Sequence, residues 1–275
     1  MDAVDVRAEI RAGRWTEPTA GIGFGYVQAN LLVLPAEHAL AFATFCRRNP
    51  RACPLLDVTD PGDPRPPLAA PGADLRTDLP RYRVYRRGEL VDEPTSIEGL
   101  WRDDHVAFLL GCSFSFERAL VDAGVRLRHV EENRNVAMYR TSLPCRPAGP
   151  FRGSVVVSMR PVRREQVPLV NEICSGFLLA HGAPIAAGDP AALGIADLAR
   201  PDFGDAVKLA PGEVPVFWAC GVTSQAAALS ADLELVIAHA PGHMFVTDWP
   251  HEAARELGLL LGDEVSRCAD SPSLS

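Results

Sequence analysis

The chain has 275 residues, 47% of them hydrophobic, which is enough apolar content for one large or two small globular domains. Its formal net charge of −8 and its lack of a basic run argue against nucleic acid and anionic membranes as partners. No apolar run is long enough to span a membrane, and the N-terminal segment lacks the apolar stretch of a secretory signal. Because seven cysteines without an export signal indicate reduced thiols, we expect a cytoplasmic protein.

Hydrophobic periodicity and the positions of glycine and proline predict the elements of the first third of the chain. They are a helix at Val4–Ala12, a strand at Tyr26–Leu34, a helix from Pro35 to Asn49-Pro50, a hairpin at Tyr82–Leu90 and a short helix at Ser96–Leu100.

Between these elements lies a proline-rich segment, Leu55–Tyr85, with six prolines and two glycines. Prolines fix φ and remove N–H donors, so this segment cannot be a central strand or a helix. It carries enough apolar residues to dock on the fold. We expect a rigid loop that presents its charged residues to a cleft, namely Asp74, Arg76, Asp78, Arg81 and Arg83. The alternative is a stiff, solvated connector.

A strand–helix–strand pattern occurs twice. The first copy has strands at Val106–Leu110 and Val125–Val130 around a helix at Phe116–Ala123. The second has strands at Val214–Ala219 and Leu233–His239 around a helix at Ser224–Ser230. Continuous apolar strands on either side of a helix are typical of a parallel βαβ unit with a right-handed crossover.

The two copies also share a motif at the end of the first strand. A shift of about 108 positions places Cys112 on Cys220, Ser115 on Thr223 and Glu117 on Gln225, which gives Cys-x-x-(Ser/Thr)-x-(Glu/Gln) twice. Two matches in the same context suggest two related βαβ halves of one sheet. Ligands of open α/β sheets bind at the carboxyl ends of the strands, so both cysteine turns are expected to face the binding site.

The segment between the two copies has a different character. It is expected to hold a strand at Ser154–Arg160, a helix at Arg164–Ser175 and short strands at Ile195–Leu198 and Ala206–Leu209. We therefore predict an α/β fold in which a small α+β domain, residues 150–212, is inserted into a main domain of residues 1–149 and 213–275. The tail, Pro250–Ser266, is expected to form a last amphipathic helix.

Several long phrases of this sequence resemble the D-glutamate cyclase family, over about residues 20–250. They include QANLLVLP, FCRRNPRACPLLDVTDPGDP, APGADLRTDLPRYRVYRRGELV, LWRDDHVAFLLGCSFSFE, HGAPIAAGDPAALGIADLARPDFGD and HAPGHMFVTD. The resemblance implies a three-layer α/β/α sheet domain with a smaller two-layer α+β domain inserted. It also implies an enzyme, a carbon–oxygen lyase (hydro-lyase), that converts D-glutamate to 5-oxo-D-proline and water.

That reaction needs cations for carboxylates, a base, an acid and donors for a developing oxyanion. A guanidinium binds a carboxylate through two hydrogen bonds, so Arg76, Arg81 and Arg146 are the expected carboxylate ligands. Surface salt bridges are the alternative role for these arginines.

The turns that open the two helices are the expected oxyanion site. Free N–H groups at a helix N-terminus bind anions, and Ser113 and Ser115 add hydroxyls in the first turn. Cys112 is a candidate thiolate nucleophile, although a free cysteine is more often an inert buried residue. In the second turn, Cys220 and Thr223 are candidates for substrate binding, with Thr223 as a helix cap in the alternative.

The best acid–base cluster is His239 and His243 with Asp248, because it follows a buried strand and neutral imidazole moves protons near pH 7. The HxxxH spacing binds metals when it lies on a helix, which Pro241 and Gly242 prevent here, so no metal ligands are assigned. Asn30, on the first strand, is a candidate substrate donor or a paired buried amide. The required cofactor is unknown, and a divalent metal stays open.

These residues favour a lyase that acts on a small amino or hydroxy diacid, with D-glutamate as the best candidate. Two alternatives stay open, a non-catalytic small-molecule binding or regulatory protein and a hydrolase of lactams or amides. We expect a small-molecule diacid as partner and neither nucleic acid nor membrane. The sequence is compatible with a homo-oligomer and does not fix the oligomeric state.

Overall fold

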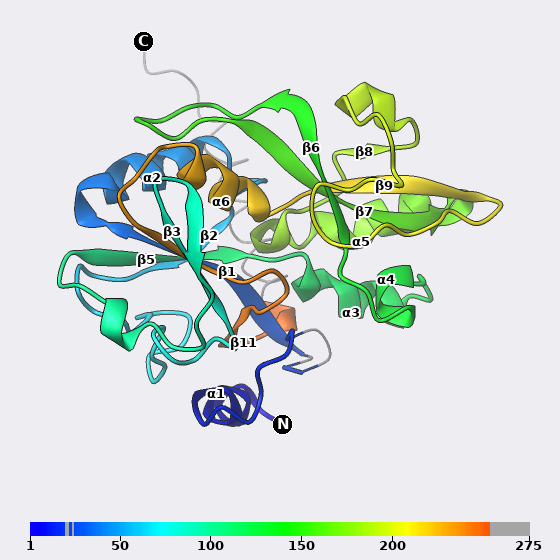
Figure 1. Ribbon diagram of the computed structural model, residues 1–275. Coiled ribbons are helices and arrows are strands. Elements are labelled where there is room, and N and C mark those ends of the chain that lie inside the picture. Colours follow the sequence, from blue (N-terminus) through cyan, green and yellow to red (C-terminus); the bar gives the residue numbers. More distant parts are fainter. Residues whose placement is uncertain (20–21, 24, 254–275) are drawn as a thin grey trace, which may run out of the picture.

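Two antiparallel β-sheets lie side by side in the computed structural model, which describes residues 1–19, 22–23 and 25–253 (Figure 1). The helices are α1 (Ala3–Arg11), α2 (Ala36–Arg48), α3 (Phe114–Asp122), α4 (Arg128–Glu131), α5 (Val167–Ser175) and α6 (Val222–Leu229). The strands are β1 (Tyr26–Pro35), β2 (Leu55–Val58), β3 (Tyr82–Arg86), β4 (Glu89–Asp92), β5 (His105–Gly111), β6 (Ala137–Pro144), β7 (Ser154–Arg163), β8 (Ala186–Ala187), β9 (Glu213–Ala219), β10 (Val236–His239) and β11 (Phe245–Pro250). Short 3-10 turns are η1 (Glu98–Leu100), η2 (Arg164–Gln166), η3 (Leu178–Ala180) and η4 (Pro190–Leu193).

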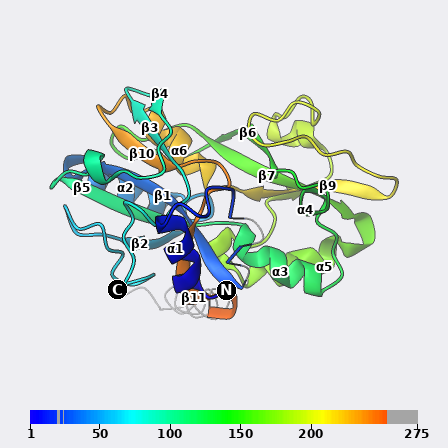
Figure 2. The ribbon, with the colours of Figure 1, turned by 60° about the horizontal axis from the view of Figure 1, so that its bottom comes forward.

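Sheet A has the strand order β2-β5-β1-β10-β3-β4, with β11 also paired to β1. Sheet B has the order β6-β7-β9-β8. Helices α3 and α5 lie together below sheet B, whereas α1 packs against β11 (Figure 2). Among the described residues, no helix is long and apolar enough to cross a membrane.

The α/β class is confirmed, but the expected parallel βαβ units are wrong. Every strand pair of the two sheets is antiparallel. In the first copy, Val125–Val130 forms no strand, and part of it belongs to α4. In the second copy the three elements exist, but β9 belongs to sheet B and β10 to sheet A. Apolar periodicity predicts where strands lie and does not say which strands pair.

The repeated motif nevertheless marks a true structural repeat. In sheet A, β1 pairs with β5 from Ala29–Gly111 to Pro35–His105. In sheet B, β7 pairs with β9 in the same register, from Val157–Ala219 to Arg163–Glu213. We call Tyr26–Pro144 the first half and Ser154–His239 the second half. Each half has two paired strands, a cysteine turn, a helix and a final strand that joins the sheet of the other half.

The proline-rich segment covers one face of sheet A. Leu75 and Leu79 of this loop are fully buried in one cluster with Leu31 and Val33 of β1. The alternate β1 residues, Leu32 and Leu34, pack on the other face against α2. Successive strand residues point to opposite faces, so β1 is covered by a loop on one side and by helices on the other. This packing excludes the solvated connector.

Carboxylates hold this loop in place, because its prolines cannot form strand hydrogen bonds. Asp57 Oδ2 accepts hydrogen bonds from the N–H groups of Leu68 (2.8 Å) and Ala69 (2.7 Å). Buried Asp78 accepts two hydrogen bonds from Arg11, at 2.8 and 2.7 Å. Asp78 therefore fastens the loop to α1 and has a structural role.

Three further predictions concern the short strands, the inserted domain and the tail. The predicted short strands Ile195–Leu198 and Ala206–Leu209 are not strands in the structure. Sheet B takes β6 and β9 from either side of residues 150–212, and the boundaries of the inserted domain stay a prediction. The predicted tail helix lies largely outside the described residues.

Replacement of Asp57 by asparagine is expected to destabilise the fold by about 2–3 kcal/mol, because one carboxylate oxygen that accepts two backbone N–H groups is lost. Urea unfolding followed by circular dichroism measures this change. The control is Asp60→Asn at an exposed position of the same loop. Equal stability of the two variants would contradict the anchoring role of Asp57.

Candidate active site

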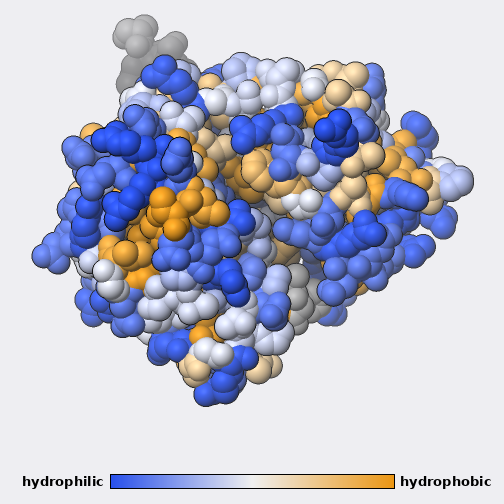
Figure 3. Space-filling model, viewed as in Figure 1, coloured by the Kyte–Doolittle hydropathy of each residue, from blue (hydrophilic) through white to orange (hydrophobic). Residues whose placement is uncertain are grey.

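A cavity of about 100 Å³ lies between the two sheets, beside the crossovers β5–α3 and β9–α6. In the space-filling view, hydrophilic residues cover most of the surface, and hydrophobic residues show in the hollow between the two parts of the molecule (Figure 3). Both sheets line the cavity. Its lining includes Asn30, Cys112, Ser113, Cys220 and His239, which the sequence had singled out.

The two crossovers are built alike. Ser115, in α3, accepts a hydrogen bond from the N–H of Gln28 in β1 (3.3 Å). Thr223, in α6, accepts one from the N–H of Val156 in β7 (2.9 Å). These hydroxyls tie each helix to the first strand of its own half, so neither faces the cavity as the oxyanion or substrate ligand that the sequence suggested.

The sixth residue of each motif connects its helix to the sheet of the other pair of strands. Glu117, in α3, pairs with Arg160 in β7. Gln225, in α6, donates a hydrogen bond to the hydroxyl of Tyr85 in β3 (2.9 Å). Each helix is thus tied to both sheets, and the cavity lies where these connections meet.

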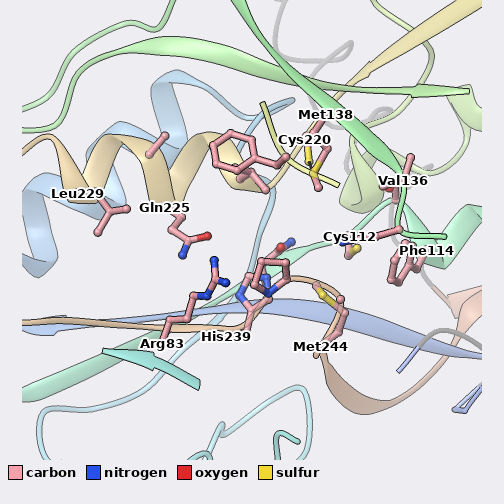
Figure 4. Close-up of a pocket in the computed structure, with 18 of the residues that line it drawn as sticks. Arg83, Cys112, Phe114, Val136, Met138, Cys220, Gln225, Leu229, His239 and Met244 are labelled. Carbon is pink, nitrogen blue, oxygen red and sulfur yellow. Dashed lines mark hydrogen bonds between the residues drawn. The ribbon is translucent and has the colours of Figure 1, made fainter. Parts of the chain in front are cut away.

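Cys112 and Cys220 face the cavity from equivalent positions (Figure 4). Burial raises the pKa of Cys112 to about 12. Burial also raises the pKa of Cys220, whose Sγ donates a weak hydrogen bond to Met138 Sδ (3.6 Å). Both thiols are therefore protonated near neutral pH, and a nucleophilic Cys112 would need a base to remove its proton.

Asn30 is a paired, buried amide with a fixed orientation. Its Nδ2 donates to the carbonyls of Gly111 (2.7 Å) and Leu110 (3.2 Å). A Cβ atom on Gly221 would lie 2.3 Å from Asn30 Nδ2. The second cysteine turn therefore needs glycine at position 221, so that the amide of Asn30 can pack against it.

His239 is the buried imidazole of the cavity. Its Nδ1 lies 3.2 Å from the N–H of Leu31 and 3.3 Å from the Leu31 carbonyl oxygen, so the backbone of β1 fixes the ring. Burial lowers the pKa of His239 to about 4. The ring is neutral at pH 7, and Nε2 is its nitrogen without a partner in the described part of the chain.

Two cations line the cavity, one from each sheet. Arg83, in β3, pairs with Glu93, and Figure 4 shows its side chain pointing toward Gln225. Arg140, in β6, lies over the ring of Phe203 and is 3.8 Å from Asp202. Arg83 was singled out as part of the proline-rich segment. Arg140 was missed, because its place on a strand edge carries no local signal.

The other arginines that were expected to bind carboxylates lie away from the cavity and do not converge on one site. Arg76 pairs with Asp74 at 2.7 Å within the proline-rich loop. Arg146 lies near the end of α2, where its N–H donates to Asn49 Oδ1. Neither these two nor Arg81 lines the cavity. The guanidinium of Arg76 is held by an aspartate two residues earlier in the same loop, a contact that the sequence pattern does not reveal.

The expected His243–Asp248 pair is also absent. His243 Nδ1 is 2.9 Å from the carbonyl oxygen of Pro241, and the ring does not line the cavity. Asp248 pairs with Arg7 of α1 at 2.6 Å. Asp248 therefore anchors α1 to β11 and orients neither histidine.

The largest omission is Arg160, whose side chain is fully buried behind Ser113. The signal was present in the sequence, since SVVVSMRPV places one arginine in an otherwise apolar strand. Among the described residues, no group of three or more His, Cys, Asp or Glu side chains could hold a metal ion.

The chain is thus an α/β protein with a polar-lined cavity between its two sheets. The model of the D-glutamate cyclase family matches residues 106–248. A protein of Rubrobacter xylanophilus, named "Putative hydro-lyase", is 63% identical and aligns over 90% of this chain and 95% of its own. A protein of Bacillus subtilis, named "Putative hydro-lyase YcsI", is 55% identical, and the alignment covers 90% of this chain and 96% of that protein.

The chain belongs to the D-glutamate cyclase family, and its enzyme class is hydro-lyase, a carbon–oxygen lyase. In structure it aligns with a nitrogen repressor-like protein of Methanococcus jannaschii at a TM-score of 0.39 and 10% identity, over 90% of this chain and 98% of that one. A likeness at this level carries no argument about function.

The low pKa of His239 predicts that acid destabilises the fold. Burial lowers this pKa from 6.5 to about 4, so the unfolded chain binds a proton in that interval that the folded chain does not. The contribution of His239 to stability therefore falls as the pH drops from 6.5 toward 4.

A His239→Gln variant should lose less stability over this range than the wild type in urea unfolding. The control His38→Gln, in α2, should follow the wild type, and parallel curves for all three would contradict the shift.

Proposed function

We propose that the cavity binds D-glutamate and closes it to 5-oxo-D-proline with release of water. In this reaction the amine nitrogen forms a bond to the γ-carboxyl carbon. A C–O bond of that carboxyl breaks, and its oxygen leaves as water with two protons. The membership in the D-glutamate cyclase family and the polar groups of the cavity support this assignment.

The observation that carries the proposal is the pair of cations on opposite sheets. D-Glutamate is a short dicarboxylate, and arginine binds carboxylates through paired hydrogen bonds. Arg83 from sheet A and Arg140 from sheet B, which both line the cavity, are the proposed ligands of one carboxylate each. A substrate held in this way bridges the two halves of the chain.

His239 is the proposed proton carrier. Its neutral ring can take a proton from the substrate ammonium group and return one to the departing oxygen. The fixed contact of Nδ1 with β1 leaves Nε2 for this exchange. The hydroxyl of Ser113, which lines the cavity, is the proposed donor to the developing oxyanion. We also propose a cytoplasmic location, which the six free cysteines of the described residues support.

The direct test is incubation of the purified protein with D-glutamate, L-glutamate and a panel of diacids, with 5-oxoproline measured by chromatography. We expect 5-oxo-D-proline from D-glutamate. Stabilisation by a diacid without turnover would support a binding protein instead. Turnover only from 5-oxoproline to glutamate would support a lactam hydrolase.

Loss of either cation should weaken substrate binding. Arg83→Gln and Arg140→Gln are each expected to raise KM about 10- to 100-fold, as expected for loss of one charged hydrogen-bonded contact. Arg126→Gln is the matched control, because Arg126 pairs with Glu131 on the surface. If both cavity variants keep the wild-type KM, these arginines do not bind the carboxylates.

Loss of the proton carrier should affect the chemical step. His239→Gln is expected to lower kcat about 100-fold or more while KM changes little, the usual size of a general acid–base contribution. Steady-state kinetics measures both constants. An unchanged kcat would assign proton transfer to another group.

A further inference from the structure

Behind the cavity, Arg160 is held by a closed set of buried polar groups. Its side chain is fully buried in β7. Its Nη2 donates to Ser113 Oγ (3.0 Å), and its Nη1 donates to Ser158 Oγ (3.1 Å). Glu117 Oε1 accepts from its Nε (3.1 Å) and also accepts from its Nη2. The guanidinium also packs against the neighbouring rings of Phe116 and Trp218, 5.2 and 5.3 Å from their centroids.

The carboxylate of this set stays ionised. Burial acts to raise the pKa of Glu117, but the charges of Arg160 and His129 outweigh it and lower the pKa to about 2. His129 Nε2, from α4, lies 3.0 Å from the same Glu117 Oε1. Glu117 is thus a fixed counter-ion and a poor base.

The repeat provides an internal comparison, because Arg160 lies in the second half and its equivalent, Leu32, lies in the first. Leu32 pairs with Phe108 at the same register position at which Arg160 pairs with Val216. The partner of Arg160, Glu117, corresponds to the neutral Gln225. The fold therefore accepts an apolar residue, Leu32, at the strand position equivalent to Arg160. Buried ion pairs add little stability over apolar packing, so the fold alone does not account for Arg160.

The hydrogen bonds around Ser113 determine what its hydroxyl can do. Arginine has only donors, so the hydrogen bond from Arg160 occupies an oxygen lone pair of Ser113. The hydroxyl hydrogen has no acceptor among the described residues, and Ser113 lines the cavity. The hydroxyl can therefore donate only toward the cavity, and the adjacent positive charge strengthens this donor.

We propose that Arg160 is a positioning residue that fixes and polarises the Ser113 hydroxyl as a donor to the oxyanion formed at the substrate carboxyl. The inference rests on the proposed function of the cavity. It assigns to a fully buried arginine, which does not touch substrate, a share of the stabilisation of the transition state. Ser113 makes the contact, and Arg160 acts through it.

The test is a double-mutant cycle on conversion of D-glutamate to 5-oxo-D-proline. Ser113→Ala removes the donor and should lower kcat about 100-fold with little change in KM, as for loss of one oxyanion donor. The double variant Arg160→Leu/Glu117→Gln puts at each of the two positions the residue found at the equivalent position of the other half, Leu32 or Gln225, and removes both charges of the buried pair. It should lower kcat about 10-fold. Combined with Ser113→Ala, it should add nothing further, because Arg160 acts only through this hydroxyl.

Three results would overturn the inference while the proposed function stands. One is a Ser113→Ala variant with wild-type kcat. The second is a triple variant whose kcat falls by the product of the Ser113→Ala loss and the double-variant loss. The third is an Arg160 effect that appears only in the melting temperature. If the double variant does not fold, Ser113→Ala with Arg160→Lys completes the cycle, since lysine keeps the charge. Arg126→Leu, at a surface pair with Glu131, controls for loss of an arginine. A wild type that does not convert D-glutamate overturns both the proposed function and this inference.

Discussion

The structure depends on one constraint, which is that α3 and α6 are each fastened to both sheets. Ser115 and Thr223 bind the backbone of the strand in their own half, whereas Glu117 and Gln225 reach the opposite sheet. Each helix begins at the cysteine turn where the chain leaves one sheet. The positions of the turns are therefore determined by four side chains, and the cavity is the space that these four connections leave between the sheets.

The sequence predicted elements better than it predicted pairing. The strand Tyr26–Leu34, the helix that ends at Asn49 and the hairpin near Arg87 all appear close to their expected bounds, because periodicity and turn residues act locally. The direction of β5 relative to its neighbours was wrong. Strand direction depends on where the chain goes after the helix, and α3 leads to sheet B rather than back to sheet A.

The same limit applies to the site. Cys112, Ser113, Asn30, Cys220 and His239 were chosen because they end or adjoin buried strands, and the structure brings them to one cavity. Arg76 and Arg146 are predicted from the affinity of a guanidinium for carboxylates, and Asp248 from its place after a buried strand. None of the three lines the cavity, and Arg76 and Asp248 form ion pairs with Asp74 and Arg7 instead. Arg140 and Arg160 required the three-dimensional arrangement, since their importance comes from what lies opposite them in space.

The exchange of final strands between the halves has a consequence for how the molecule folds. β6 belongs to the first half but lies beside β7, and β10 belongs to the second half but lies beside β1. Neither half can complete its own sheet, so an isolated half would expose an unpaired strand edge. The chain is interlocked in the manner of a domain-swapped dimer joined into one polypeptide, and long-range pairing must precede the formation of any substrate site.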